Sequence, residues 1–134
     1  MARLQLEIVT PDRVVLSAKV DYVSLPGAEG EFGILPGHIP FFAALKLGCM
    51  HYQIGSETLY ASIGGGFAEI ADDTVQVLVD SAELAKEIDV NRAEAARQRA
   101  QERLSSAQRD KLNVARAEAA LQRAVTRLHV VEFL

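Results

Sequence analysis

The sequence lacks the residues on which several classes of protein depend. Its 134 residues include a single cysteine, Cys49, so neither an internal disulfide nor a thiolate metal cluster is expected. No apolar run approaches the ~20 residues that a helix needs to cross a bilayer, and the first residues lack the apolar segment of a signal peptide. We therefore expect a soluble intracellular protein without direct membrane insertion.

The patterns that mark catalytic and metal sites are also missing. The histidines, His38, His51 and His129, lack the spacing of metal ligands, and no Gly-x-Ser-x-Gly elbow occurs. The glycine run at 64–66 leads into a strand-like segment, whereas a phosphate-binding loop needs Lys-Ser/Thr and a helix. Glycines that permit a bulge or the close approach of another backbone fit better. The sequence thus predicts neither an enzyme nor a metal site.

Charges of opposite sign dominate the two parts of the chain. Residues 1–87 hold 5 basic and 12 acidic side chains, whereas residues 88–134 hold 9 basic and 6 acidic ones. This asymmetry bears on partners and on attraction between the two parts. Nucleic-acid binding is disfavoured, because the net charge is −4 and the basic part has no Phe, Tyr or Trp before Phe133 to stack on bases.

Up to about Val79 the chain reads as short strands separated by turns. Apolar residues alternate with polar ones at Leu4, Leu6 and Ile8, and the alternation resumes after a turn at 11–13. The resumed alternation is carried by Val14, Leu16, Ala18 and Val20, and later strand-like runs lie at 52–54, 59–63, 67–70 and 74–79, with turns at 55–57 and 72–73. Several strands at short spacing predict a sandwich or flattened barrel.

From Asp89 onward the sequence contains neither glycine nor proline, and strong helix formers dominate. We expect Asp89 to cap a first helix that runs through Leu104, and Asp110 to cap a second that extends to about Leu128. The break between them is predicted at 105–110.

Each predicted helix carries one apolar stripe rich in alanine. The stripe positions are Ala93, Ala96, Ala100 and Leu104 on the first helix and Val114, Ala117, Leu121, Ala124 and Leu128 on the second. Alanine buries little area at ~25 cal/mol per Å². We therefore expect the hairpin to detach from the β domain, without melting, at a cost on the order of a few kcal/mol. The predicted fold is an antiparallel β-sandwich (flattened barrel) over residues 1–87, followed by an antiparallel α-helical hairpin over residues 88–134.

Residues 27–40, Gly-Ala-Glu-Gly-Glu-Phe-Gly-Ile-Leu-Pro-Gly-His-Ile-Pro, hold four glycines and two prolines. Such a composition specifies tight backbone turns. The apolar residues between the turns, which would anchor the segment to a core, are Phe32, Ile34, Leu35 and Ile39. By pattern alone, the segment is a complicated connection between strands.

Arginines gather on both predicted helices. Two on the first helix are seven residues apart and two on the second are four apart, so each pair shares a face. If the helices pack antiparallel, the four guanidinium groups converge and offer bidentate donors to phosphate oxygens, while nearby carboxylates accept from an adenine amino group or a ribose hydroxyl. Residue chemistry alone favours the alternative of a solvated basic face. The residues concerned are Glu83, Asp89, Arg92, Arg99, Arg123 and Arg127.

Two motifs resemble the epsilon subunit family of the ATP synthases. They are Gly-Glu-Phe-Gly-Ile-Leu-Pro-Gly-His-Ile-Pro at 30–40 and Ser-Ile-Gly-Gly-Gly-Phe-Ala-Glu at 62–69. The opening Leu-Glu-Ile-Val-Thr-Pro at 6–11 and the arginine-rich hairpin are similar to that family too, so the match covers essentially the whole chain. The resemblance implies a non-catalytic rotor subunit of a bacterial proton-translocating F-type ATP synthase, peripheral on the cytoplasmic face of the inner membrane.

In that family the β-sandwich docks on the gamma subunit of the central stalk and on the c-ring, coupling rotation to the catalytic core. The loop that matches residues 31–40 lies on the c-ring side. The resemblance implies that the residues in contact with the gamma subunit or the c-ring are Glu29, Glu31, Phe32, Leu35 and His38. For His38 an alternative stays open, in which its ring only satisfies nearby backbone groups.

The run Ile-Asp-Val-Asn-Arg-Ala at 88–93 is similar to a motif through which some bacterial epsilon subunits bind ATP. The resemblance implies ATP as a regulatory ligand, with no cofactor required. Bound ATP would hold the hairpin down; without ATP an extended arm would reach the alpha and beta subunits and block hydrolysis. A structural rotor adaptor without nucleotide sensing is the alternative. The implied ATP-binding residues are Glu83, Ile88, Asp89, Arg92, Ala93, Arg99, Arg123 and Arg127.

Overall fold

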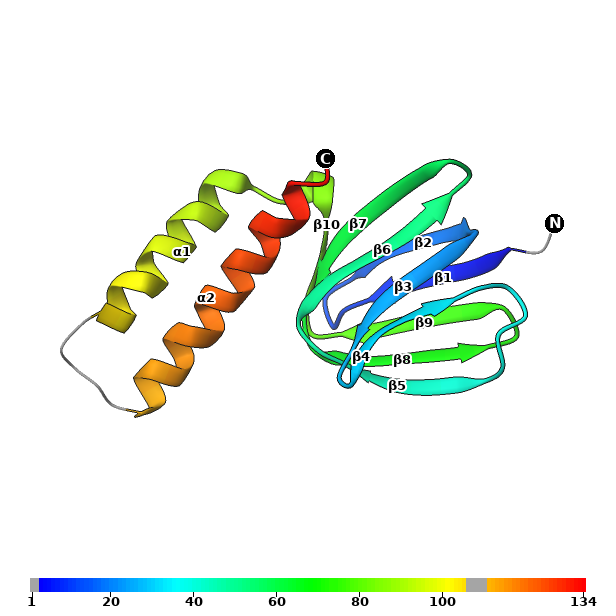
Figure 1. Ribbon diagram of the computed structural model, residues 1–134, viewed down its shortest axis with the longest axis horizontal. Helices are drawn as coiled ribbons and strands as arrows, with labels where there is room; N and C mark the ends of the chain where they lie inside the picture. The colour runs from blue at the N-terminus through cyan, green and yellow to red at the C-terminus, as the bar shows by residue number, and fades with distance from the viewer. Residues whose placement is uncertain (1–2, 106–110) are drawn as a thin grey trace.

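Strands and helices occupy separate parts of the chain in the computed structural model, which describes residues 3–105 and 111–134 (Figure 1). The strands are β1 (Leu4–Val9), β2 (Val14–Val20), β3 (Tyr22–Gly27), β4 (Gly30–Ile34), β5 (Phe41–Leu45), β6 (Gly48–Ile54), β7 (Glu57–Ile63), β8 (Gly66–Ala71), β9 (Thr74–Val79) and β10 (Ala82–Leu84). A 3₁₀ turn, η1 (Ala85–Glu87), then leads into α1 (Val90–Ser105) and α2 (Lys111–Val131). The predicted cap Asp110 lies outside the described residues, as does most of the predicted break at 105–110.

The strands, here called the β body, form one curled sheet in the order β10-β7-β6-β3-β5-β8-β9-β1-β2, with β4 paired to β3. The two ends of this path meet, because β2 contacts β6 and β10. The sheet therefore closes into the flattened barrel that the sequence predicts. One detail differs from the prediction: β1 and β9 pair in parallel, with Leu6 opposite Val75, among otherwise antiparallel pairs in the described chain.

Alternating side chains fill the interior of the β body. Leu4, Leu6 and Ile8 of β1 are fully buried, as predicted. Val14 was expected to point inward, but it is 60% exposed and Val15 is buried instead. The reason is a shift in register, since the pairing of β1 with β2 is irregular between Ile8 and Val9.

The glycine- and proline-rich segment at 27–40 contains more regular structure than its composition suggests. Residues 30–34 form β4, which pairs antiparallel with β3. Gly30 and Gly37 take φ angles of 134° and 85°, which other residues avoid. Both prolines and Gly37 thus follow the strand, and beyond the tight β3–β4 turn at 28–29 the predicted irregular connection is confined to residues 35–40.

The helices agree closely with the pattern from which they were predicted. Asp89 caps α1, since its Oδ1 accepts a hydrogen bond of 3.0 Å from the backbone N–H of Arg92. The first helix ends at Ser105, and the second runs three residues past the predicted Leu128. No helix in the described part of the chain combines the length and apolar character needed to cross a membrane.

The alanine stripes hold the two helices to each other. Ala93, Ala100, Ala117 and Ala124 are at most 3% exposed, where α1 packs on α2. Figure 1 shows α2 lying between α1 and the β body, and α2 contacts β6, β7 and η1. The stripes therefore do not set the strength of attachment to the β body, contrary to the reasoning from the sequence.

A separate cluster attaches the hairpin to the β body. We call it the junction cluster: it consists of buried Ala85, Ile88 and Val130, with Cys49, Tyr60 and Val131 packed against it. Two large aliphatic side chains buried in this way contribute about 3–6 kcal/mol together. Detachment at a cost of a few kcal/mol stays a prediction, now with a defined interface.

The glycine run at 64–66 was expected to allow the close approach of another backbone, and substitutions in the run can test this expectation. A Cβ on Gly66 would collide with the backbone carbonyl of Leu78 and lie 2.7 Å from Cα of Val79, whereas a Cβ on Gly65 would meet its nearest atom at 3.7 Å. Gly66→Ala should therefore lower the free energy of unfolding by about 1–3 kcal/mol, and Gly65→Ala should change it by less than about 1 kcal/mol. Urea denaturation measures both; equal losses would contradict this account of the run.

Candidate functional site

A cleft of 590 Å³ opens between the hairpin and the end of the β body. Its volume lies in the range of pockets that hold small molecules. The lining residues come from β10 and its flanks (Ser81, Glu83, Glu87), from α1 and its cap (Asp89, Arg92, Ala93, Ala96, Arg99) and from α2 (Ala120, Arg123, Arg127). The structure thus brings together seven of the eight residues predicted for nucleotide binding.

Helical spacing places the arginines of the cleft. Arg92 and Arg99 lie two turns apart on α1, and Arg123 and Arg127 lie one turn apart on α2. Ala93 and Ala96 lie between the arginines of α1, and Ala120 lies one turn before Arg123, so small side chains line part of the space between the helices and β10. The alanine content of the hairpin therefore keeps the cleft open as well as packing the two helices.

One ion pair crosses the cleft from the hairpin to the β body. Nε of Arg127 on α2 donates to Oε1 of Glu83 on β10 over 2.5 Å. Both side chains are about one-third exposed (33% and 32%), so solvent screening limits the pair to about 1 kcal/mol or less. A phosphate in the cleft would compete with Glu83 for this guanidinium.

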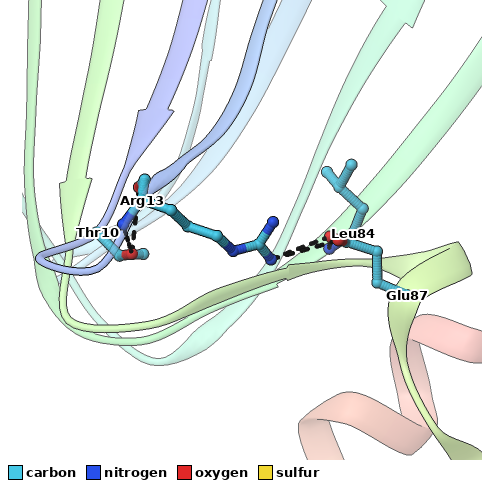
Figure 2. A network of polar contacts seen from close by, with 4 residues as sticks. All are labelled: Thr10, Arg13, Leu84 and Glu87. Carbon is cyan, nitrogen blue, oxygen red and sulfur yellow. Dashed lines mark hydrogen bonds and ion pairs between the residues drawn. The ribbon is translucent and has the colours of Figure 1, made fainter.

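One carboxylate that lines the cleft, that of Glu87, is fixed by residues outside the lining (Figure 2). The carboxylate of Glu87 accepts from Nη2 of Arg13 at 3.3 and 3.4 Å and from the backbone N–H of Leu84 at 3.1 Å. Thr10, in the turn before Arg13, in turn accepts from the backbone N–H of Arg13 at 3.3 Å. These contacts tie η1 to the turn between β1 and β2 and partly neutralise Glu87.

The cleft consequently offers two kinds of surface. The helices present four guanidinium groups, which are donors only, and the β10 side presents carboxylates, which are acceptors. A molecule with an anionic end and neutral hydrogen-bond donors at its other end matches both surfaces. Nowhere in the described ranges do three or more His, Cys, Asp or Glu side chains gather in a way that could hold a metal ion.

Ile88 is the one predicted residue that does not line the cleft. It is 8% exposed and belongs to the junction cluster. Four lining residues were not singled out from the sequence as ligands: Ser81, Glu87, Ala96 and Ala120. Helical spacing from Arg92 and Arg123 reaches Ala96 and Ala120, whereas no sequence signal places Ser81 or Glu87, because their position depends on the path of β10.

The predicted stalk-contact residues fall at two ends of β4. Glu29 and Glu31 are exposed at or beside the turn from β3, and Glu31 accepts a hydrogen bond from Oγ of Ser24. Leu35, 61% exposed, and His38 lie beyond the other end. They therefore do not form one compact patch.

Besides Glu31, two of these residues have local partners. The half-buried ring of Phe32 meets Phe41 edge-on, with ring centroids 5.6 Å apart. Nδ1 of His38 lies 2.7 Å from the carbonyl oxygen of Ile39, which agrees with the alternative of a ring satisfied by nearby backbone.

A third surface was missed by the sequence reasoning. Phe42, Phe67 and Leu78 point outward from β5, β8 and β9 and are 63%, 50% and 44% exposed. Phe42 and Phe67 stack with ring centroids 5.3 Å apart. We call these three residues the outer apolar face. The sequence did contain a signal for this face, because Phe67 and Leu78 occupy positions on the outward side of the alternating strands, where polar side chains are expected.

Similarity to known proteins covers both parts of the chain. Residues 3–85 match the beta-sandwich domain of the ATP synthase delta/epsilon chain, and residues 86–132 match its long alpha-helix domain. An ATP synthase epsilon chain from Syntrophobacter fumaroxidans is 54% identical over 130 residues, which cover 97% of this chain and 96% of the relative. One from Nitratidesulfovibrio vulgaris strain DP4 is 54% identical over 102 residues, 76% of each chain.

Solved structures show the same fold. A chain of the mitochondrial ATP synthase of Euglena gracilis superposes with a TM-score of 0.80 at 25% identity, covering 99% of this chain and 81% of its own length. A chain of the Tetrahymena thermophila enzyme gives a TM-score of 0.62 at 13% identity, covering 97% of each. The chain therefore belongs to the ATP synthase delta/epsilon family, as an epsilon chain, a non-catalytic subunit of that complex.

Proposed function

We propose that this chain is a rotor subunit of the central stalk of a bacterial, proton-translocating ATP synthase and that its hairpin restrains ATP hydrolysis. The Euglena structure that it resembles is of an assembly that includes the c-ring, which supports a position between that ring and the catalytic core. In this proposal the protein sits peripherally on the cytoplasmic face of the membrane. The β body stays fixed on the rotor while the hairpin changes position.

The proposed ligand of the cleft is ATP. One observation carries this proposal: arginines from both helices and carboxylates from β10, η1 and the cap of α1 line a single cleft of nucleotide size. The guanidinium groups would hold the phosphates, and Glu83 and Asp89 would accept from the adenine amino group or a ribose hydroxyl. A ligand bound in this way touches hairpin and β body at once, so it binds only the docked state.

The stabilisation that ATP binding can supply is similar in size to the free energy that attaches the hairpin to the β body. A ligand that binds one state only stabilises it by about 2.7 kcal/mol when its concentration is 100 times its Kd. The junction cluster contributes about 3–6 kcal/mol, so the ATP concentration can shift the balance between docked and detached hairpins. When ATP falls, the detached basic hairpin would reach the alpha and beta subunits and block rotation in the direction of hydrolysis.

The outer apolar face is the surface that we assign to the gamma subunit. Three exposed apolar side chains on adjacent strands are unusual on a monomer and typical of a protein interface. Contact with the c-ring is assigned to the predicted residues on and beside β4, which are Glu29, Glu31, Phe32, Leu35 and His38. The two assignments place the β body between two rotor components.

ATP binding is tested by calorimetric titration of the full chain. Arg99→Ala removes a guanidinium group that lines the cleft, whereas Arg103→Ala removes an exposed one a helical turn further along α1. Because a charge-assisted hydrogen bond contributes about 1.5–3 kcal/mol, Arg99→Ala should raise the Kd about tenfold or more, and Arg103→Ala should leave it unchanged. Absence of heat from the unsubstituted chain at millimolar ATP would favour the adaptor without nucleotide sensing.

Docking on the gamma subunit is tested by co-purification. Phe67→Asp places a charge in the centre of the outer apolar face and should weaken the complex by about 2 kcal/mol or more. Val14→Asp is the matched control, because Val14 is similarly exposed at 60% but lies on β2. If both variants are retained equally by the gamma subunit, the interface lies elsewhere.

A further inference from the structure

A line of aromatic rings joins the β body to the end of α2. The ring of Phe133 stacks on Tyr60 of β7, with centroids 4.2 Å apart and planes 10° from parallel. Tyr60 in turn contacts His51 at 5.6 Å, and Phe133 meets His129 edge-on at 5.2 Å. Among these contacts, the Tyr60–Phe133 stack is the one that crosses from hairpin to β body.

Phe133 is held in place by the helix that precedes it. Its backbone N–H donates to the carbonyl of Val130 over 3.2 Å, and the next N–H, that of Leu134, donates to Val131 over 3.0 Å. Val130 itself is fully buried in the junction cluster. The ring is therefore an extension of α2 and moves with it.

The surface that receives the ring is mainly apolar. Phe133 and Leu134 border a hollow of 330 Å³ on the β body, whose apolar lining includes Leu16, Ile54, Leu59 and Leu84. The Arg127–Glu83 pair lies in the cleft, whereas neither residue of the stack lines it. The stack and the nucleotide cleft thus hold the hairpin at separate places.

We propose that the Tyr60–Phe133 stack is a latch that keeps the hairpin docked when the cleft is empty. This inference rests on the proposed movement of the hairpin and adds a restraint that needs no ligand. Aromatic pairs contribute beyond the area that they bury, by an amount that corresponds to a factor of roughly two to ten in an equilibrium. Together with the junction cluster, the latch sets the fraction of detached hairpins from which ATP then shifts the balance.

The native Cys49 thiol reports detachment in the full chain. It is half-buried, packs against the junction cluster and borders a groove with Val125, Thr126 and His129 of α2. Burial, with the charge of Glu31, raises the pKa of this thiol. When opening is fast relative to the reaction, its alkylation rate by a bulky maleimide follows the population of detached hairpins.

Phe133→Leu keeps an apolar side chain and removes the ring. It should raise the alkylation rate of Cys49 roughly two- to tenfold, without shifting the midpoint of global unfolding. Phe133→Tyr keeps the stack and should react at nearly the original rate, as should Val14→Ala, which changes an exposed side chain outside the stack and the junction cluster. An unchanged rate in Phe133→Leu, or a rise explained by a lowered unfolding midpoint, would overturn the latch.

A double-mutant cycle isolates the contact itself. Tyr60→Leu should accelerate alkylation by a similar factor, and the variant with both substitutions should react little faster than either alone. Effects that multiply would mean that the two rings act independently, which rules out the latch. ATP added in the same assay separates the two proposals, because ATP that holds the hairpin docked should slow the alkylation of Cys49. If ATP does not slow alkylation but Phe133→Leu still accelerates it, only nucleotide sensing is contradicted. If ATP slows alkylation but Phe133→Leu does not accelerate it, only the latch is contradicted.

Discussion

The attachment of α2 to the β body is the contact on which the rest of the structure depends. Three side chains are buried in the junction cluster, against nineteen in the core of the β body, among the described residues. Because apolar burial supplies most of the favourable free energy of folding, the β body is the stable unit and the hairpin is held by a small fraction of that energy. A small interface of this kind can open without unfolding either part.

The cleft exists only while this contact is made. Its arginines belong to the helices and Glu83 belongs to β10, so separation of the hairpin divides the lining into two surfaces. Opposite net charge favours the docked arrangement, with an acidic β body facing a basic hairpin. Small side chains serve two purposes here, because the alanines that pack the helices closely also leave the cleft unfilled.

Much of the fold and site could be read from the sequence, since periodicity and capping are local properties. Alternation located β1 and β9, and Asp89 located the start of α1. The spacing of the arginines predicted which guanidinium groups line the cleft. Contacts that depend on the path of the chain could not be read in this way: the parallel pairing of β1 with β9, the register shift that buries Val15, and the position of Glu87. Ile88 belonged to a recognised motif, yet its place in the junction cluster follows from the docking of α2.

The most direct test of a hairpin that regulates by leaving the β body is to prevent its departure. Position 126 of α2 and the native Cys49 line one groove. In the Thr126→Cys variant a short bis-maleimide, small enough to enter the groove that excludes a bulky maleimide, can link the two thiols in the assembled complex, with mono-reacted protein as the control. ATP hydrolysis is then measured at low ATP. A regulatory hairpin predicts that the linked complex hydrolyses ATP faster than the control, because the arm cannot reach the catalytic subunits. Equal inhibition in the linked and control complexes would contradict the account.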